Sequence, residues 1–367
     1  MPAPDRVRLV VLFGGQSAEH DVSCVSAYHV LRAVDPQRYA LDAVGITREG
    51  QWVRADDAIA ALHTARGSAP AALRAGDGQL EAIGTAVEPL PALSPAAHDD
   101  LPVVVLPLLH GPRGEDGTVQ GMLELAGIPF VGSGVLASAL CMDKRKAKDV
   151  LAANGLPQAG WLGVRDTELE DLEDRVDAAG LSYPVFVKPA NMGSSVGVSR
   201  VAERGDLVAA IAVATEYDEW IVIEEGVEAR ELEVGVLGNA APRASVPGEV
   251  VPTHDFYDYE DKYVDGAAEL RIPADLPDDV TDEIRRLAVK AFSVLSCDGM
   301  ARVDFFYEAG GRGLLVNEVN TIPGFTPISM YPKLWEASGV SYSELIDELV
   351  GLALERHERR SRFSTKH

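Results

Sequence analysis

Four polar side chains near the end of the chain could together bind a divalent cation: Arg302, Asp304, Glu318 and Asn320. They lie on two β-rich runs, residues 301–307 and 313–319, separated by a turn-forming segment, and this pattern predicts an antiparallel hairpin. In that hairpin Asp304 lies opposite Glu318, and because like charges directly opposite each other repel, a cation between them is favoured. Carboxylate and amide oxygens suit Mg²⁺, which fills its other positions with water and phosphate. An amphipathic hairpin with a solvated acidic face remains an open alternative.

A second segment, residues 183–201, has the features of a phosphate-binding hairpin. A strand ends at Lys188, and the following loop contains Gly193, Ser194 and Ser195, whose backbone N–H and hydroxyl groups could bind phosphate oxygens. The same loop matches the G-x-S-x-G pattern of α/β-hydrolases, with Ser195 as nucleophile, but that motif requires a helix directly after the serine. The β-branched residues 196–201 predict a strand there instead, which favours the phosphate loop.

The N-terminal elements that must position these groups have the pattern of a parallel α/β domain. A continuous apolar run at residues 7–13 predicts a strand buried on both faces, and a glycine loop, a helix and a strand at residues 40–46 follow. Ligands of such sheets bind outside the carboxyl ends of the strands, although the GxGxxG dinucleotide spacing is absent. Glu19 in the first loop could pair with a substrate ammonium, or it could be a carboxylate in the first turn of a helix.

The sheet is expected to resume at residues 103–108, after an edge insertion at residues 67–100. His110 lies in the polar loop that follows and is either a structural histidine or a ligand contact. A helix is expected at residues 118–126 and a short strand at residues 128–131.

Further candidate contacts for a nucleotide follow along the chain. A helix at residues 143–154 begins with Lys144 in a run of lysines, which is usually a solvated face but here offers a phosphate contact. A strand at residues 220–225 ends in Glu224 and Glu225. The backbone after it could meet an adenine edge, and Glu231 could accept from ribose hydroxyls.

Residues 251–266 are rich in tyrosine and aspartate and show neither helix nor strand period. A long loop of this kind in a compact domain is typically a lid, and Lys262 and Tyr263 could close over a bound nucleotide and substrate. An amphipathic helix is expected at residues 277–295, and a final helix at residues 342–359 is expected to pack Leu345, Leu349, Leu352 and Leu354 inward.

Composition limits the possible partners of the chain. With 367 residues and a net charge of -24 it is a chain of two or three domains that lacks the basic surface a nucleic acid or an anionic membrane requires. Three widely spaced cysteines favour a reducing cytoplasm. No segment approaches the ~18 apolar residues of a membrane span.

Taken in order, six motifs make the chain resemble the D-alanine–D-alanine ligase family of the ATP-grasp carboxylate–amine ligases over nearly its whole length: LFGGQSAEHDVS, LHGPRGEDGTVQG, MDK, VKPANMGSSVG, FYDYEDKY, and RVDFF with NEVNTIPGFTPIS. The resemblance implies an α/β fold, α+β in part, with ATP-grasp architecture. A Rossmann-like parallel domain (residues 1–137) would hold the first D-alanine. Two domains that clamp ATP would follow, residues 138–228 with the phosphate loop and residues 229–367 with the lid and the metal hairpin 301–320.

The resemblance also implies the role of each matching residue. The ATP site would comprise Lys144, Lys188, Ser194, Ser195, Glu224, Glu225, Val227, Glu231, Lys262, Asn317 and Glu318. Two Mg²⁺ ions, with Mn²⁺ as a possible substitute, would be held by Asp304, Glu318 and Asn320. The substrates would contact Glu19, His110, Arg302, Gly324 and Ser329. A hydrogen-bonded triad would join Glu19, Ser194 and Tyr263, while Arg302 and the backbone of Gly324 would stabilise the tetrahedral intermediate, with His110 nearby.

The implied reaction is the ATP-dependent joining of two D-alanine molecules through a D-alanyl phosphate, for peptidoglycan precursor synthesis in the cytoplasm by a homodimer. A D-alanine–D-lactate ligase is an alternative, and the Lys262-Tyr263 pair favours the alanine-specific form. Another ATP-grasp ligase, a serine hydrolase at Ser195 and a non-catalytic nucleotide-binding module are further alternatives. The module is disfavoured because nucleotide binding alone does not require Arg302 opposite Asn320.

Overall fold

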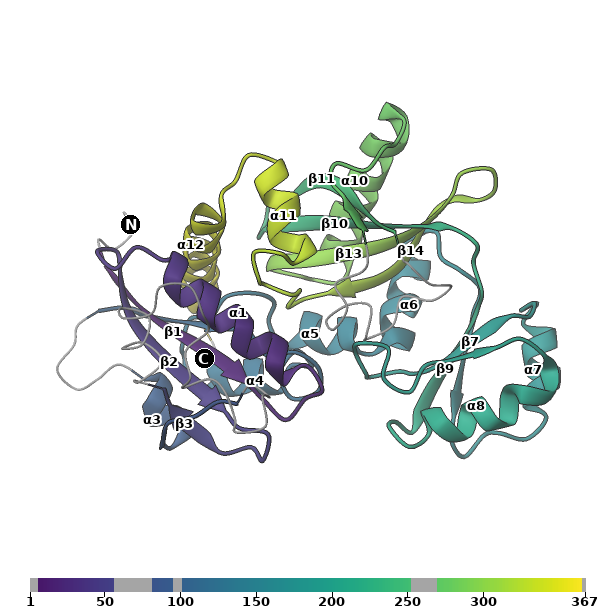
Figure 1. Cartoon of the computed structure of the whole chain (residues 1–367), viewed down its shortest axis with the longest axis horizontal. Helices are drawn as coiled ribbons and strands as arrows, with labels where there is room; N and C mark the ends of the chain where they lie inside the picture. Colours follow the sequence, from purple (N-terminus) through teal and green to yellow (C-terminus); the bar gives the residue numbers. More distant parts are fainter. Residues whose placement is uncertain (1–5, 56–80, 95–100, 252–268, 365–367) are drawn as a thin grey trace.

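The computed structural model describes residues 6–55, 81–94, 101–251 and 269–364. Within these residues the strands form three separate sheets, and Figure 1 shows them as three bodies joined by helices. The fold is α/β with antiparallel parts, as expected from the sequence.

The first sheet has the strand order β4-β3-β2-β1-β5. β1 (Val7–Gly14) pairs in parallel with β2 (Tyr39–Ile46) on one side and with β5 (Val103–Pro107) on the other, as the apolar runs predicted. β1 lies between two strands and is buried on both faces: Leu9 and Val11 pack in one core, and Val10 and Leu12 pack in another. An antiparallel edge and three helices complete this body: β3 (Trp52–Arg54), β4 (Thr85–Ala86), α1 (His20–Ala33), α3 (Pro89–Leu93) and α4 (Thr118–Leu125).

The strand predicted at residues 128–131 is wrong in extent. Only one isolated bridge forms there, between Val105 and Phe130, although Phe130 and Val131 are buried as a strand would be. The segment lies at the open edge beside β5, where the chain turns away into Gly132 after a single pairing.

The second sheet has the order β6-β9-β7-β8 and is antiparallel. The predicted strand ending at Lys188 and its return strand are both present, but the return strand is only three residues long. The elements of this body are β6 (Trp161–Arg165), α7 (Leu172–Ala178), β7 (Val185–Pro189), β8 (Ser199–Val201), the 3-10 helix η2 (Arg204–Asp206), α8 (Leu207–Ala214) and β9 (Trp220–Glu225).

The third sheet has the order β12-β11-β10-β13-β14 and contains the predicted hairpin. Asp304 pairs with Glu318 and Arg302 with Asn320, which confirms the predicted register. The pairing shifts by one residue after Asp304, so that Asn317 is skipped between two ladder pairs. The elements are β10 (Arg230–Gly238), β11 (Arg243–Val251), β12 (Glu269–Arg271), α10 (Asp278–Val294), β13 (Gly299–Glu308) and β14 (Gly313–Asn320).

Two helices between the first and second sheets pack against the third. α5 (Val135–Met142) and α6 (Lys144–Ala153) contribute buried residues such as Ala137 and Leu151 to the core beneath β13 and α10. Asp143 caps α6 by accepting hydrogen bonds from the backbone N–H groups of Arg145 and Lys146, as predicted. α6 therefore spans from the third sheet to the second, and Figure 1 shows it between them.

The end of the chain returns to the first sheet. α11 (Met330–Ala337) and α12 (Tyr342–Ser361) place Trp335, Leu345 and Leu349 in one core with β1 residues such as Leu9. The predicted inward face of the last helix is confirmed at Leu345 and Leu349. The first and third sheets are thus packed together through a shared core.

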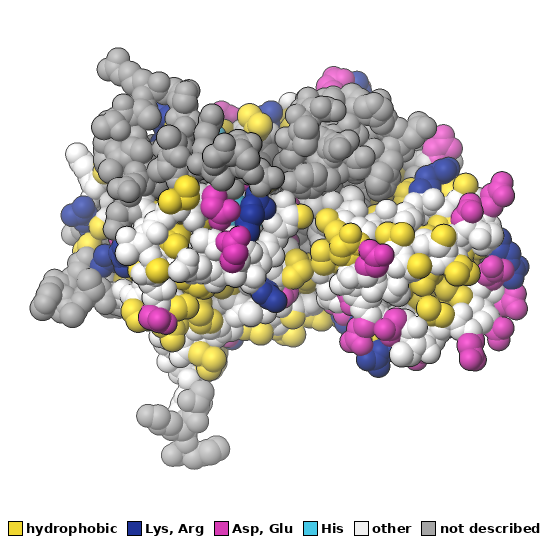
Figure 2. All heavy atoms as spheres, turned by 60° about the horizontal axis from the view of Figure 1, so that its bottom comes forward, with side chains coloured by type: hydrophobic (Ala, Val, Ile, Leu, Met, Phe, Trp, Pro, Cys, Tyr) yellow, Lys and Arg dark blue, Asp and Glu magenta, His cyan; other side chains and the backbone are white. Residues whose placement is uncertain are grey.

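On the face shown in Figure 2, acidic side chains gather over the body that contains α7 and α8. There Glu173, Asp174 and Asp177 surround the single guanidinium of Arg204. Among the residues that the structure describes, no helix is long and apolar enough to cross a membrane.

Candidate active site

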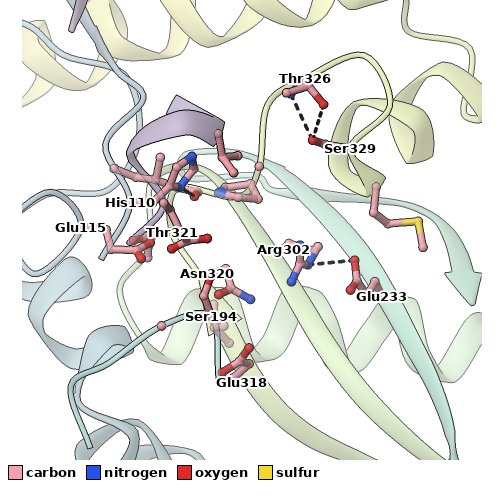
Figure 3. A pocket seen from close by; sticks show the side chains of 18 of the residues that line it. His110, Glu115, Ser194, Glu233, Arg302, Glu318, Asn320, Thr321, Thr326 and Ser329 are labelled. Carbon is pink, nitrogen blue, oxygen red and sulfur yellow. Dashed lines mark hydrogen bonds and ion pairs between the residues drawn. The ribbon is translucent and has the colours of Figure 1, made fainter. Parts of the chain in front are cut away.

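A cavity of about 640 Å³ lies where the three bodies meet. Many of the predicted site residues line it: Glu19, His110, Lys144, Ser194, Arg302, Glu318, Asn320, Gly324 and Ser329. Figure 3 shows six of them, arriving from separate segments around one space: His110, Ser194, Arg302, Glu318, Asn320 and Ser329. The other described candidates lie outside its lining: Lys188, Ser195, Glu224, Glu225, Val227, Glu231, Asp304 and Asn317. Lys262 and Tyr263 lie outside the described residues.

The floor of the cavity is the polar face of the β13–β14 hairpin. Arg302 donates two hydrogen bonds of 2.7 Å to the two carboxylate oxygens of Asp304, and Asn320 Nδ2 donates to Asp304 Oδ2 at 2.9 Å. Glu233 on β10 approaches Arg302 Nε at 2.9 Å. Burial alone would lower the pKa of Arg302, but Asp304 and Glu233 outweigh it and raise the pKa well above its usual range. A fixed positive charge therefore points into the site.

The oxygen donors predicted for a divalent cation are on this same face. Glu318 and Asn320 line the cavity, and Asp304 lies behind them with 8% of its surface exposed. Because Asn320 donates its amide N–H to Asp304, its amide oxygen is directed away from that carboxylate. In the described part of the chain no group of three His, Cys, Asp or Glu side chains is arranged to hold a metal ion.

The glycine-serine loop is tied to the start of α6. The backbone N–H of Lys144 donates to Ala190 O at 3.0 Å, and Lys144 Nζ donates to Met192 O at 2.5 Å. Burial lowers the pKa of Lys144, which Glu318 partly offsets. Ser194 and Ser195 have positive φ angles of 49° and 57°. No helix follows Ser195, since the chain continues into β8, and this excludes the hydrolase elbow.

Behind this loop lies a buried ion cluster. Glu224 pairs through one oxygen with Lys188 and through the other with Lys148, a residue that the sequence analysis did not select. Burial would raise the pKa of Glu224, but the two ammonium groups lower it to about 2. A lysine-rich helix start is typical of a solvated face, but Lys148 lies one turn after Lys144 on the same face, and that spacing was the available signal.

The segment predicted to meet adenine and ribose follows β9. Glu225 accepts from the backbone N–H of Gly160 at 2.6 Å and pairs with Arg312, while Gly226 donates to Pro184 O at 2.8 Å. Val227 lies in the short connection to β10, and Glu231 is on β10 opposite Phe306. These contacts fix the backbone of the connection beside the second sheet.

The N-terminal wall of the cavity contains two carboxylates. A Cβ placed on Gly193 would lie 3.5 Å from Glu19 Oε2 and 3.9 Å from Glu115 Oε1, so the serine loop lies over both groups. Glu115 accepts from the Gly111 N–H at 2.8 Å. Burial and the neighbouring Glu19 raise the pKa of Glu115 to about 8. Glu115, Asp21, Glu233 and Lys333 also line the cavity and were not selected from the sequence.

His110 uses one of its two ring nitrogens in a hydrogen bond to another described residue. Nδ1 bonds with Ile322 O at 3.0 Å, and Nε2 has no hydrogen-bond partner among the described residues. Since the ring is 95% covered (5% exposed) and lines the cavity, the ligand-contact interpretation is favoured over a purely structural one.

The opposite wall is the loop after β14. Ser329 Oγ lies 2.8 Å from Thr326 Oγ1 and accepts from the Thr326 N–H at 3.1 Å. A Cβ on Gly324 would come within 3.1 Å of Ser329 Oγ, so only glycine leaves this approach open. The loop therefore presents a hydroxyl and an accessible backbone beside Arg302.

Comparison with known proteins gives consistent matches along the whole chain. Residues 8–133 match the family model described as D-ala D-ala ligase N-terminus, and residues 150–351 match D-ala D-ala ligase C-terminus. D-alanine--D-alanine ligases from Thermoanaerobacter sp. and Geobacillus kaustophilus are each 46% identical over 361 residues, covering 98% and 97% of this chain and 99% and 96% of those proteins.

Solved structures agree with these matches. The D-alanine-D-alanine ligase from Coxiella burnetii aligns with a TM-score of 0.79 and 34% identity over 98% of this chain and 97% of that one. The VanG D-Ala:D-Ser ligase from Enterococcus faecalis aligns with a TM-score of 0.77 and 33% identity over 95% and 99%. These matches, with a cavity built from the expected motifs, establish that the chain belongs to the D-alanine–D-alanine ligase family and has the ATP-grasp fold.

Proposed function

We propose that this protein joins two D-alanine molecules to D-alanyl-D-alanine and converts ATP to ADP and phosphate. The observation that supports this most directly is the convergence of Glu19, Lys144 and Arg302 on one cavity from three separate regions of the chain. A carboxylate, an ammonium and a guanidinium so arranged can hold an amino acid and the phosphates of a nucleotide together.

The first D-alanine would bind with its ammonium at Glu19 and its carboxylate near Arg302 and the backbone N–H of Gly324. Glu115, protonated at neutral pH because its pKa is about 8, would leave Glu19 as the negative partner of the ammonium. His110, which lines the cavity, would lie near the same substrate.

The carboxylate of this D-alanine would then attack the γ-phosphorus of ATP and form a D-alanyl phosphate, with ADP as leaving group. Lys144 and Lys188 would neutralise the transferring phosphoryl oxygens, and the Ser194-Ser195 loop would cover them. Asp304, Glu318 and Asn320 would hold two Mg²⁺ ions, for which Mn²⁺ could substitute. Bound there, the ions would supply charge neutralisation on the phosphate oxygens. Glu224, Glu225, Val227, Glu231 and Asn317 would complete the nucleotide site.

The amine of the second D-alanine would next attack the acyl carbon, and phosphate would leave. Arg302 and the Gly324 N–H would stabilise the oxyanion, while Ser329 would bind the carboxylate of the incoming amino acid. Lys262 would contact the transferred phosphoryl group, and Tyr263 would join Glu19 and Ser194 in a hydrogen-bonded triad. Closure over the site would exclude water, which otherwise hydrolyses the acyl phosphate.

The proposal includes a homodimer in the cytoplasm that supplies peptidoglycan precursors. The three cysteines are free and buried, and Cys141 Sγ lies 3.7 Å from Cys297 Sγ without a disulfide, which agrees with a reducing compartment.

Isotope transfer tests the two-step reaction. With D-alanine labelled by ¹⁸O in its carboxylate, one label should appear in the released phosphate for each dipeptide formed, because the attacking oxygen leaves with phosphorus. L-alanine serves as the control and should release no phosphate. Dipeptide formation with unlabelled phosphate would contradict the acyl phosphate route.

A further inference from the structure

Lys148 is a buried lysine that the proposed reaction does not use. Only 2% of its surface is exposed, and its Nζ pairs with Glu224 Oε1 while Lys188 Nζ pairs with Glu224 Oε2. Like Lys188 and Glu224, Lys148 does not line the cavity. Burying a charge costs free energy unless it is paired, so the pair with Glu224 is what allows Lys148 to be buried.

The pair connects two bodies of the protein. Lys148 is on α6, whose neighbouring residues Ala147 and Leu151 pack in the core of the third sheet. Glu224 is on β9 of the second sheet, where it pairs across the ladder with Phe186 of β7. Gln158 Nε2 also donates to Lys148 O at 3.1 Å, which fixes the backbone of α6 at this point. The Lys148–Glu224 pair is therefore a buried contact between α6 and the second sheet.

Glu224 has two ammonium partners, Lys148 and Lys188, and in the proposed function Lys188 binds the phosphates of ATP. Lys188 Nζ is held at Glu224 outside the cavity lining, so reaching nucleotide phosphates in the cavity would draw it away from this carboxylate. Glu224 would then be a buried carboxylate whose remaining ammonium partner is Lys148. Without Lys148, moving Lys188 away would leave the buried Glu224 carboxylate without an ammonium partner. The free energy needed to reach that state would weaken nucleotide binding.

We propose that Lys148 is a positioning residue for nucleotide binding, which neutralises Glu224 so that Lys188 can leave this carboxylate and bind the phosphates of ATP. The proposal rests on the proposed function for the role of Lys188. Lys148 acts through Glu224 and does not contact the nucleotide.

Calorimetric binding of a non-hydrolysable β,γ-imido ATP analogue with Mg²⁺ to the full chain tests this. Lys148→Met should weaken binding about tenfold or more, because Glu224 then retains Lys188. Lys146→Met is the matched control: Lys146 is on the same helix, exposed, and pairs with Asp149 at 2.9 Å. This control should bind the analogue as the unmodified protein does. Unchanged affinity in Lys148→Met would overturn the proposal.

The Glu224→Gln background separates positioning from packing. A neutral amide does not hold Lys188 as a carboxylate does, so adding Lys148→Met to Glu224→Gln should change the affinity no more than about twofold. Equal loss in both backgrounds would indicate a packing role and contradict the proposal. If Lys148→Met alone fails to fold, the double variant still tests the proposal. Binding of the analogue more than about twofold weaker in the double variant than in Glu224→Gln would overturn the proposal.

The outcome for the reaction is measured separately. Failure of the unmodified protein to form dipeptide would reject the proposed function, whereas the analogue affinities of the four variants decide the role of Lys148 whether or not dipeptide is formed.

Discussion

Arg302 binds both carboxylate oxygens of Asp304, two residues along the same strand, through hydrogen bonds of 2.7 Å each. The bidentate contact fixes the guanidinium plane and the carboxylate together on the floor of the cavity. Arg302, proposed to stabilise an oxyanion, and Asp304, proposed to bind metal, thereby position each other. Changes at either one should affect catalysis more than folding.

Asp304→Asn should lower kcat by about a hundredfold or more, because the amide keeps the shape but loses the negative charge that holds a divalent cation. The Mg²⁺ concentration for half-maximal activity should also rise. Steady-state kinetics across a Mg²⁺ titration measures both. Glu308→Gln, on the same strand but paired with Arg312 at the far end of the hairpin, is the control and should retain activity. Unchanged Mg²⁺ dependence in Asp304→Asn would contradict the metal assignment.

Arg302→Lys should lower kcat by about tenfold to a hundredfold, since a lysine keeps the charge but cannot make the two parallel hydrogen bonds. Arg230→Lys is the control. Arg230 does not line the cavity, and it makes a similar bidentate contact with Glu249 through hydrogen bonds of 2.7 and 2.8 Å. Only Arg302→Lys should lose turnover, whereas Arg230→Lys should keep it. Equal kcat values would remove Arg302 from the reaction.

Glu115→Gln should alter how stability depends on pH. The folded-state pKa of about 8 lies above the ordinary value of 4.5, so the folded protein keeps a proton that the unfolded chain has lost between these values. The contribution of Glu115 to the free energy of unfolding is therefore fully present below about pH 4.5. It declines by at most ~1.4 kcal/mol per pH unit as the pH rises towards 8. The amide of Glu115→Gln does not titrate, so the variant lacks this loss of stability with pH. Denaturation curves should show Glu115→Gln gaining relative stability as pH rises, and parallel profiles would refute the assignment.

Gly14→Ala should destabilise the protein severely. Gly14 has a φ of 86°, and a Cβ there would lie 2.2 Å from Ile46 O, at the edge where β1 meets β2. Gly127→Ala isolates the conformational cost, because its φ is 67° and nothing lies within 4 Å of the added Cβ. We expect about 1 kcal/mol for Gly127→Ala and on the order of 3 kcal/mol or more for Gly14→Ala. Chemical denaturation measures both, and similar losses would show that the clash is relieved elsewhere.

The sequence predicts the β13–β14 register well because side chains alternate strictly along a strand and the glycine turn defines its centre. With those two facts, Asp304 opposite Glu318 follows directly, and the structure confirms it. The one-residue shift that skips Asn317 has no comparable signal, since a bulge leaves the apolar alternation on either side nearly intact.

Local sequence patterns do not predict contacts between segments that are far apart in the chain. Lys148 belongs to a lysine-rich helix, and only the approach of β9 makes its face a buried one. Glu115 lies in the same polar loop as His110, but its role depends on the serine loop that covers it. α5 was missed because its short apolar run follows a glycine-rich boundary and acquires its partners only in the core beneath β13.

The central claim is tested most directly by incubating the protein with ATP and Mg²⁺ and measuring phosphate release with D-alanine, L-alanine, or D-alanine plus D-lactate, with the products separated by mass. The proposed function predicts phosphate release that requires D-alanine, with one D-alanyl-D-alanine formed for each phosphate and no depsipeptide in excess of dipeptide. ATP turnover without dipeptide would move the second substrate to another class. No turnover with any of these substrates would contradict the account.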